Sequence, residues 1–227
     1  MRGALFALLL LFPLFAYAEE ISVTFHERAT LTIETHTGEI TLTAVGSREV
    51  FSGEVDFTPN IGRLVGSGLL TEVYEPPLIA ELKPGHFLVC ENCTAIAMRT
   101  FGISEGADFD SVRALADAAP RDVARRAHRE FRPSFLIIVA PPDFDLVEYP
   151  ARSDLARYFG SGVRLKSLSV EITNAPVTDS IVLEKMPWIC DQIDKLNARR
   201  TDGNSEGEIA IRRSQNALED LAQGVCA

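Results

Sequence analysis

The sequence has few basic residues for its length. Its 227 residues include 22 Lys and Arg against 32 Asp and Glu, a formal net charge of −10. Because affinity for nucleic-acid phosphates comes mainly from an excess of Lys and Arg, this balance argues against a nucleic-acid-binding protein. Apolar residues make up 46% and charged residues 24%. These proportions are typical of a folded protein and argue against extensive disorder and a multi-span membrane protein.

The sequence also has few residues that could form a common catalytic centre. Its four histidines are scattered, and no two of them have the spacing of metal ligands. No clear combination of Ser, His and a carboxylate is present, so a hydrolase has little support. We therefore expect no cofactor and favour a protein that is not an enzyme.

Residues 1–18 predict a cleaved secretory signal peptide. A basic start at Arg2 precedes the apolar run 4–15 and the small-residue pattern at residues 16–18. The run is shorter than the roughly 20 residues needed to cross a bilayer, and it contains Pro13, which breaks helices. No later segment is long and apolar enough to span a membrane. We expect a soluble mature protein, exported to the periplasm or the outside of the cell; the alternative is an uncleaved N-terminal anchor.

Residues 19–75 are predicted to form an antiparallel sheet. Ile21, Val23 and Phe25 alternate with polar residues, and two later segments repeat this period of two, which is typical of half-buried strands. A break near Gly38 favours a hairpin turn in which this glycine takes a positive φ. We expect one face of the sheet to be solvated and rich in threonine.

Residues 76–227 are predicted to form a mixed α/β part. The segments 111–119 and 120–131 have helical character, and Pro120 begins the second. The apolar run 135–140 predicts a central strand buried on both faces. Alternation over 163–172, with a slip near Ser167, predicts another strand.

Two helices are predicted to close the chain. The first begins near Pro187 and has Ile189, Ile193 and Leu196 on its inner face. The second spans 209–222 after a capping-box pattern. The short turn between them implies an antiparallel helical hairpin. The predicted fold class is therefore α+β, an antiparallel β N-terminal part followed by the mixed part, in one domain or two.

The four cysteines are Cys90, Cys93, Cys190 and Cys226. In an exported protein they are expected to form disulfides, and four cysteines allow three pairings. A bond from Cys190 to Cys226 would close about 37 residues and stabilise the fold by roughly 3–4 kcal/mol, whereas a Cys90–Cys93 bond would give only ~2 kcal/mol. We favour a structural role in which the first bond pins the C-terminal tail and the second stiffens a turn.

Two other mechanisms stay open for Cys90 and Cys93. In thiol–disulfide exchange, a CxxC motif at a helix N-terminus gains thiolate stability from the helix dipole. The segment after Pro176 could then supply the proline-led strand of a thioredoxin-like site. Glu91, inside the motif, argues against this because a nearby carboxylate raises a thiol pKa. In a zinc site, His86 would join the two cysteines, but a fourth ligand is lacking.

Asp143 and Asp145 form a weaker candidate site. They follow the predicted central strand, where paired carboxylates could hold Mg²⁺ or Ca²⁺ or act in acid–base chemistry. Such pairs also arise readily by chance, and a solvated loop is the simpler interpretation.

A set of arginines recurs at helical spacing: Arg121, Arg125, Arg129 and Arg132. On an acidic protein this stripe could bind an anionic partner, such as lipid headgroups, a polyanion or an acidic protein face. The simpler interpretation is that the arginines pair with the protein's own carboxylates.

We therefore expect an exported, disulfide-stabilised protein that acts as a non-enzymatic binding or accessory module of the cell envelope. Its partner would be an unidentified protein or an anionic envelope component, bound by the Thr-rich sheet face or the arginine stripe. The alternative is an exported thiol–disulfide oxidoreductase that uses Cys90 and Cys93.

Overall fold

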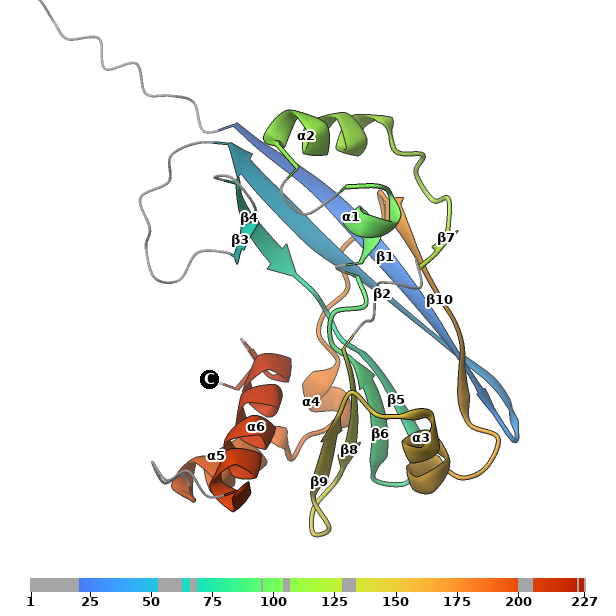
Figure 1. Cartoon of the computed structure of the whole chain (residues 1–227), viewed down its shortest axis with the longest axis vertical. Coiled ribbons are helices and arrows are strands. Elements are labelled where there is room, and N and C mark those ends of the chain that lie inside the picture. Colours follow the sequence, from blue (N-terminus) through green and yellow to red (C-terminus); the bar gives the residue numbers. More distant parts are fainter. Residues whose placement is uncertain are drawn as a thin grey trace, which may run out of the picture.

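The protein has an α+β fold, which confirms the predicted fold class (Figure 1). The predicted signal peptide, residues 1–18, lies outside the part of the chain that the structure describes. No helix in the described part is long and apolar enough to cross a membrane. The structure, a computed structural model, describes residues 21–52, 63–65, 69–94, 96–103, 107–127, 134–199, 206–223 and 225–226.

A long hairpin forms the centre of a six-stranded sheet. Strands β1 (Ile21–Thr35) and β2 (Gly38–Ser52) pair along their whole length. Gly38 follows the two-residue turn with a φ of 140°, as its sequence context predicted. The sheet has the order β3-β4-β2-β1-β10-β7, and all neighbouring strands are antiparallel. Its other strands are β3 (Arg63–Val65), β4 (Leu69–Tyr74), β7 (Arg125–Arg126) and β10 (Arg164–Thr173).

Strand β10 comes from the C-terminal half of the chain and pairs with β1. Their register shifts between Thr32, which faces Ser167, and Ile33, which faces Leu165. One residue of β10 therefore has no partner, which is a β-bulge. The bulge lies where the sequence alternation slips, so both the strand and its irregularity are confirmed.

The structure corrects the predicted helix over 120–131. The helix before it is present as α2 (Phe109–Ala118), but Asp122 has a φ of 56° and donates its backbone N–H to the Ile172 carbonyl. Arg125 and Arg126 then form β7 beside β10, while residues 128–131 lie outside the described part. The helical pattern fails because the edge of β10 offers backbone hydrogen-bond partners that outweigh a weak local preference.

A second sheet contains four antiparallel strands in the order β5-β6-β8-β9. Its interior strand β8 is the apolar run of the sequence, and residues 136–139 are buried. The predicted central strand is thereby confirmed. The strands are β5 (Leu78–Lys83), β6 (His86–Cys90), β8 (Phe135–Val139) and β9 (Asp145–Glu148).

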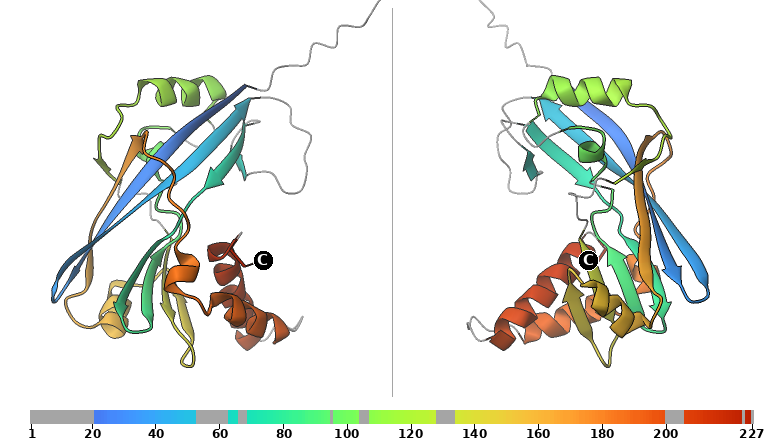
Figure 2. Two further views of the ribbon diagram at one scale, coloured as in Figure 1. Left: turned by 180° about the vertical axis from the view of Figure 1, so that it is seen from behind. Right: turned by 45° about the vertical axis from the view of Figure 1, so that its right-hand side comes forward.

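The four-stranded sheet is buried on both faces because it lies between two layers (Figures 1 and 2). On one face, Ile137 packs with Leu31 and Ile33 of the hairpin in what we call the inter-sheet cluster. On the other face, Ile138 packs with Leu218 of the C-terminal helices in the helical cluster. Helices α1 (Ala97–Thr100), α2 and α3 (Arg152–Phe159) contribute to the first cluster, and α4 (Val182–Lys185), α5 (Ile189–Ala198) and α6 (Glu206–Leu221) to the second.

Helices α5 and α6 contact each other, as the predicted helical hairpin requires. Ile189, Ile193 and Leu196 of α5 are buried, as their spacing predicted. A disulfide joins Cys190, near the start of α5, to Cys226, beyond the end of α6. Since the start of one helix is bonded to the end of the other, the two run antiparallel.

A buried ion pair lies on the inner face of the hairpin. Glu27 is 1% exposed, and Nη2 of Arg48 lies 3.3 Å from its Oε2. A carboxylate oxygen of Glu75 lies 3.7 Å from the same nitrogen. Beside the pair, a Cβ on Gly46 would lie 2.5 Å from the Tyr74 carbonyl oxygen, so this position has no room for a side chain. The inner face of the hairpin, which is otherwise apolar, thus holds two buried charges, and each one offsets the cost of burying the other.

Candidate functional site

The cysteines form two disulfides, Cys90–Cys93 and Cys190–Cys226. The favoured pairing of the sequence is therefore confirmed. Cys90 ends β6, and both Cys90 and Cys93 are buried in the inter-sheet cluster. The loop between them is tied to the start of β8, because Glu91 donates its N–H to the Ser134 carbonyl at 3.1 Å. The CxxC loop is thus hydrogen-bonded to the residue before β8 at one end of the four-stranded sheet.

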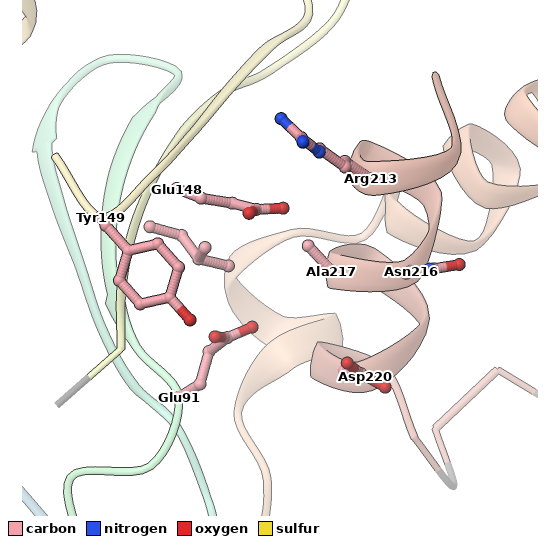
Figure 3. Close-up of a pocket in the computed structure, with 8 residues that line it drawn as sticks. Glu91, Glu148, Tyr149, Arg213, Asn216, Ala217 and Asp220 are labelled. Atoms are coloured by element: carbon pink, nitrogen blue, oxygen red, sulfur yellow. The ribbon is translucent and has the colours of Figure 1, made fainter. Parts of the chain in front are cut away.

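A pocket of about 290 Å³ opens beside this loop (Figure 3). On the sheet side, Glu91 follows the last residue of β6, and Glu148 is the last residue of β9. Both strands end next to the first residues of β8, where Cys90 pairs with Phe135 and Glu148 with Leu136. The topology therefore brings two carboxylates that are far apart in sequence to one edge of the sheet.

Helix α6 forms the opposite wall of the pocket (Figure 3). Its contributing residues, Arg213, Asn216, Ala217 and Asp220, follow helical spacing and lie on one face of the helix. Asp220 adds a third carboxylate, and Arg213 supplies the one guanidinium among the lining residues. The lining therefore carries more acidic than basic groups.

Glu91 is the most perturbed carboxyl group of the pocket. Its pKa is raised to about 7, mainly by burial and to a smaller extent by the negative charges of Asp220 and Glu148. The ordinary pKa of this group is 4.5. Glu91 is therefore about half ionised at neutral pH, and a cation placed between these carboxylates would favour its charged form.

Tyr149 stands at the rim in an unusual conformation. Its side chain is 71% exposed and its φ is 50°, a left-handed value that is uncommon for a bulky residue. Its N–H donates to the Phe135 carbonyl at 2.9 Å, which fixes the backbone there. Figure 3 shows the ring beside Glu91 and Glu148, on the side that faces α6. A strained backbone that holds an aromatic ring at the mouth of a pocket points to a role in binding.

Two arginines of the predicted helical stripe, Arg121 and Arg125, do not lie on a helix. Nη2 of Arg121 donates to the Ala116 carbonyl at 2.7 Å in the last turn of α2, and the Arg125 guanidinium lies 4.4 Å from the centre of the Phe101 ring. Arg121 and Arg125 are thus engaged within the fold, in an extended segment. Arg129 and Arg132 lie outside the described residues. Binding of an anionic partner by these arginines stays a prediction.

The aspartates predicted as a possible metal or acid–base site both lie on the surface. Asp143 is exposed in the loop before β9, and Asp145 accepts a hydrogen bond from the Tyr158 hydroxyl of α3. This hydrogen bond raises the pKa of Tyr158. Asp145 therefore links β9 to α3, which is a structural contact.

His86 lies four residues before Cys90 on β6, a separation of about 13 Å along a strand. Its Nδ1 lies 3.0 Å from the Pro84 carbonyl. The described residues contain no group of three His, Cys, Asp or Glu side chains that could hold a metal ion.

Sequence reasoning missed most of the pocket. It treated Glu91 only as an unfavourable neighbour of two thiols, and it did not single out Tyr149, Arg213 or Asp220. The spacing of Arg213 and Asp220 does place them on one helix face. Nothing in the sequence indicates that this face meets the ends of β6 and β9, because the meeting depends on how the helical hairpin packs on the sheet.

No protein-family model matches the chain, and comparisons with curated proteins and with solved structures also find no match. The candidate site therefore rests on its geometry and chemistry, and the pocket between the CxxC loop and α6 brings several polar groups together at one small cavity.

Proposed function

We propose that the protein is an exported, disulfide-stabilised binding module whose pocket holds a cationic group of its ligand, an ammonium or a guanidinium. Two disulfides fit an oxidising compartment, and the N-terminal sequence has the pattern of a signal peptide. Recognition of an amine-bearing partner, a protein side chain or a small molecule, would not require catalysis.

One observation carries the proposal: three carboxylates and an exposed aromatic ring surround one small pocket. Carboxylates provide charge-assisted hydrogen bonds to N–H donors, and they are stronger acceptors than neutral groups. A tyrosine ring attracts a cation placed over its face. Because Arg213 offsets part of the negative charge, the pocket fits a ligand with one positive group better than a multivalent metal ion.

The pocket also predicts how binding depends on pH. Glu91 has a pKa of about 7 and is ionised above that value. A bound cation interacts more strongly with the ionised carboxylate, so binding lowers the pKa of Glu91 and releases a proton. Affinity for a cation is therefore expected to rise several-fold between pH 6 and pH 8 and to fall as salt is added.

Titration followed by NMR tests the proposal with butylammonium and butylguanidinium as probes and neutral butanol as the isosteric control. We expect both cations to shift resonances of Glu91, Glu148 and Tyr149 saturably at pH 8, and butanol to leave them unchanged. Glu148→Gln should weaken cation binding at least fivefold, because it removes an ionised acceptor.

The matched control is Glu184→Gln, a substitution of an exposed glutamate on α4 outside the pocket. It changes the net charge by the same amount and should leave the affinity unchanged. The proposal would be overturned if butanol shifted the same resonances as butylammonium, or if Glu148→Gln and Glu184→Gln lost the same amount of cation affinity.

The alternative, an exported thiol–disulfide oxidoreductase, has less support from the geometry. Cys90 and Cys93 are 0% and 1% exposed, whereas disulfide exchange needs an accessible sulfur. The first helix after the motif, α1, begins at Ala97 and has four residues. The segment after Pro176 leads into helix α4, so it does not form the strand that the thioredoxin-like arrangement requires.

A further inference from the structure

Strand β2 has an open edge near the hairpin turn. Its pairing with β4 covers residues 47–51, and β1 occupies its other side throughout. In the described part of the chain, no strand pairs with residues 39–43 on the side away from β1. Edge strands of natural proteins are usually protected by lysine, proline or a bulge. The segment Glu39-Ile40-Thr41-Leu42-Thr43 has none of these, and its one charged residue, Glu39, forms an ion pair with Lys166 of β10.

The hydrogen bonds of Val45 show which residues of β2 point their backbone groups outward. Val45 donates its N–H to Oγ1 of Thr178 at 3.0 Å, and its carbonyl accepts from the Thr178 N–H at 2.9 Å. Both backbone groups of Val45 are therefore directed away from β1. Because this direction alternates along a strand, Glu39, Thr41 and Thr43 also present their N–H and C=O groups at the open edge.

The side chains at this edge are amphipathic. Glu39, Thr41 and Thr43 are exposed on the outer face of the sheet, whereas Ile40 and Leu42 are half-buried on the inner face. Leu42 packs against the inter-sheet cluster. The side chains of a strand added at this edge would alternate between the two faces of the sheet. Those on the inner face would lie next to Ile40 and Leu42, and those on the outer face next to the hydroxyl groups of Thr41 and Thr43.

We propose that this edge pairs with the same edge of a second copy of the chain, so that β2 and its symmetry mate join two sheets into one. Val45 is already occupied by Thr178, and the turn ends at Gly38, so the free outward residues are centred on Thr41. The antiparallel two-fold register that pairs all three outward residues is the one centred on the middle residue. Thr41 therefore pairs with the second copy's Thr41 on the two-fold axis.

This register matches side chains of like chemistry. Thr41 faces its symmetry mate, which is a favourable cross-strand pair. Ile40 faces the second copy's Leu42, so apolar side chains meet on the inner face, and Glu39 faces a threonine, so no like charges are opposed. The contact forms about six main-chain hydrogen bonds, two for each outward pair. A second copy is favoured over an unrelated peptide because the edge complements itself.

A pair of cysteine substitutions tests the register directly. In the proposed dimer, the two copies of residue 41 form a hydrogen-bonded pair with Cα atoms about 5.5 Å apart, within the range of a disulfide. The two copies of residue 43 are about 14 Å apart, since each lies two residues from the axis in opposite directions. After oxidation, Thr41→Cys should run as a covalent dimer and Thr43→Cys as a monomer.

Sedimentation over roughly 1–500 μM protein tests the association without engineered cysteines. Wild type should shift from monomer to dimer, and Thr41→Lys should raise the dissociation constant at least tenfold, because it opposes two like charges on the axis. Thr24→Lys, an exposed threonine on β1 away from this edge, should leave the constant unchanged. A wild type that stays monomeric, equal cross-linking at both cysteine positions, or a dimer that tolerates Thr41→Lys would overturn the proposal.

Discussion

The two faces of the four-stranded sheet are buried by different means. The face toward the hairpin meets another sheet, and near it lie the Cys90–Cys93 disulfide and the Glu27–Arg48 ion pair. The face toward the C-terminus meets α4, α5 and α6, where the buried side chains are mostly apolar but include Gln192 and Gln215. There the covalent link, Cys190–Cys226, lies outside the sheet and joins the two ends of the helical hairpin.

This difference explains where a binding site can form. Between the two sheets, apolar side chains from both sheets pack against each other in the inter-sheet cluster. On the helical side, α6 packs on the sheet as a separate layer, and the edge of that contact stays open between α6 and the ends of β6 and β9. The pocket is therefore a property of the junction between a sheet and a helix pair.

The largest expected effect concerns the buried ion pair. Arg48→Met should lower the free energy of unfolding by about 3–5 kcal/mol, because it leaves the Glu27 carboxylate, 1% exposed, without its cation. Urea unfolding measures the change. The double variant Glu27→Gln/Arg48→Met should recover much of the loss, since neither charge of the Glu27–Arg48 pair is left.

The control for this prediction lies on the same sheet. Arg164 donates to Glu34 at 2.7 Å, but its side chain is 62% exposed. Arg164→Met should therefore cost less than about 1 kcal/mol. A similar loss in both arginine variants would contradict the claim that burial makes the difference.

The two disulfides are expected to contribute unequally. Replacing Cys190 and Cys226 by alanine should cost about 4 kcal/mol, because their bond closes a long loop, and the same change at Cys90 and Cys93 about 2 kcal/mol. Urea unfolding under oxidising conditions compares them. A redox titration with alkylation of each cysteine adds the chemical test, and we expect both bonds to resist reduction until below about −300 mV. Selective opening of Cys90–Cys93 at a milder potential would instead favour the oxidoreductase.

The smallest expected effect is the pH dependence caused by Glu91. Its pKa is about 7 in the folded protein and near 4.5 when unfolded, so the folded state holds an extra proton between these values. Below pH 4.5 the carboxyl is protonated in both states, so its burial does not lower the stability. As the pH rises through 7 the buried carboxyl must ionise, and the folded state loses stability relative to the unfolded state. Glu91→Gln should therefore stabilise the protein above pH 7, by about 1 kcal/mol after allowance for solvent screening of a partly exposed group.

Unfolding measured between pH 4 and pH 8.5 would show this effect. The free energies of unfolding of wild type and Glu91→Gln should agree at low pH and differ at high pH. Glu184→Gln, on an exposed glutamate, should follow the wild type throughout. Parallel curves for Glu91→Gln and wild type would mean that the pocket does not perturb this carboxyl.

Local patterns predicted many of the elements. Period-two alternation predicted several short strands, which the structure joins into the two 15-residue strands β1 and β2; Gly38 predicted their turn, and the apolar run 135–140 predicted β8. These features are decided by side chains that are neighbours in the sequence. The helical pattern over 120–131 failed at β7, where the partner strand, β10, lies about 40 residues away.

The candidate site was predictable only in part. The sequence indicated that Cys90 and Cys93 are close to each other, and it favoured the disulfide from Cys190 to Cys226. It did not indicate that Glu91 would share a pocket with Asp220, since 129 positions separate them and no local pattern links them. The two are brought together only by the packing of α6 on the sheet.

The sequence by itself determined the α+β class, the central hairpin, the interior strand and the closing helix pair, because hydrophobic periodicity and turn residues act over short distances. Tertiary structure alone decided which edge β10 and β7 would join, which carboxylates would meet, and which part of β2 would stay open. These outcomes depend on contacts between segments that are remote in the chain, where burial and backbone hydrogen bonding outweigh local preference.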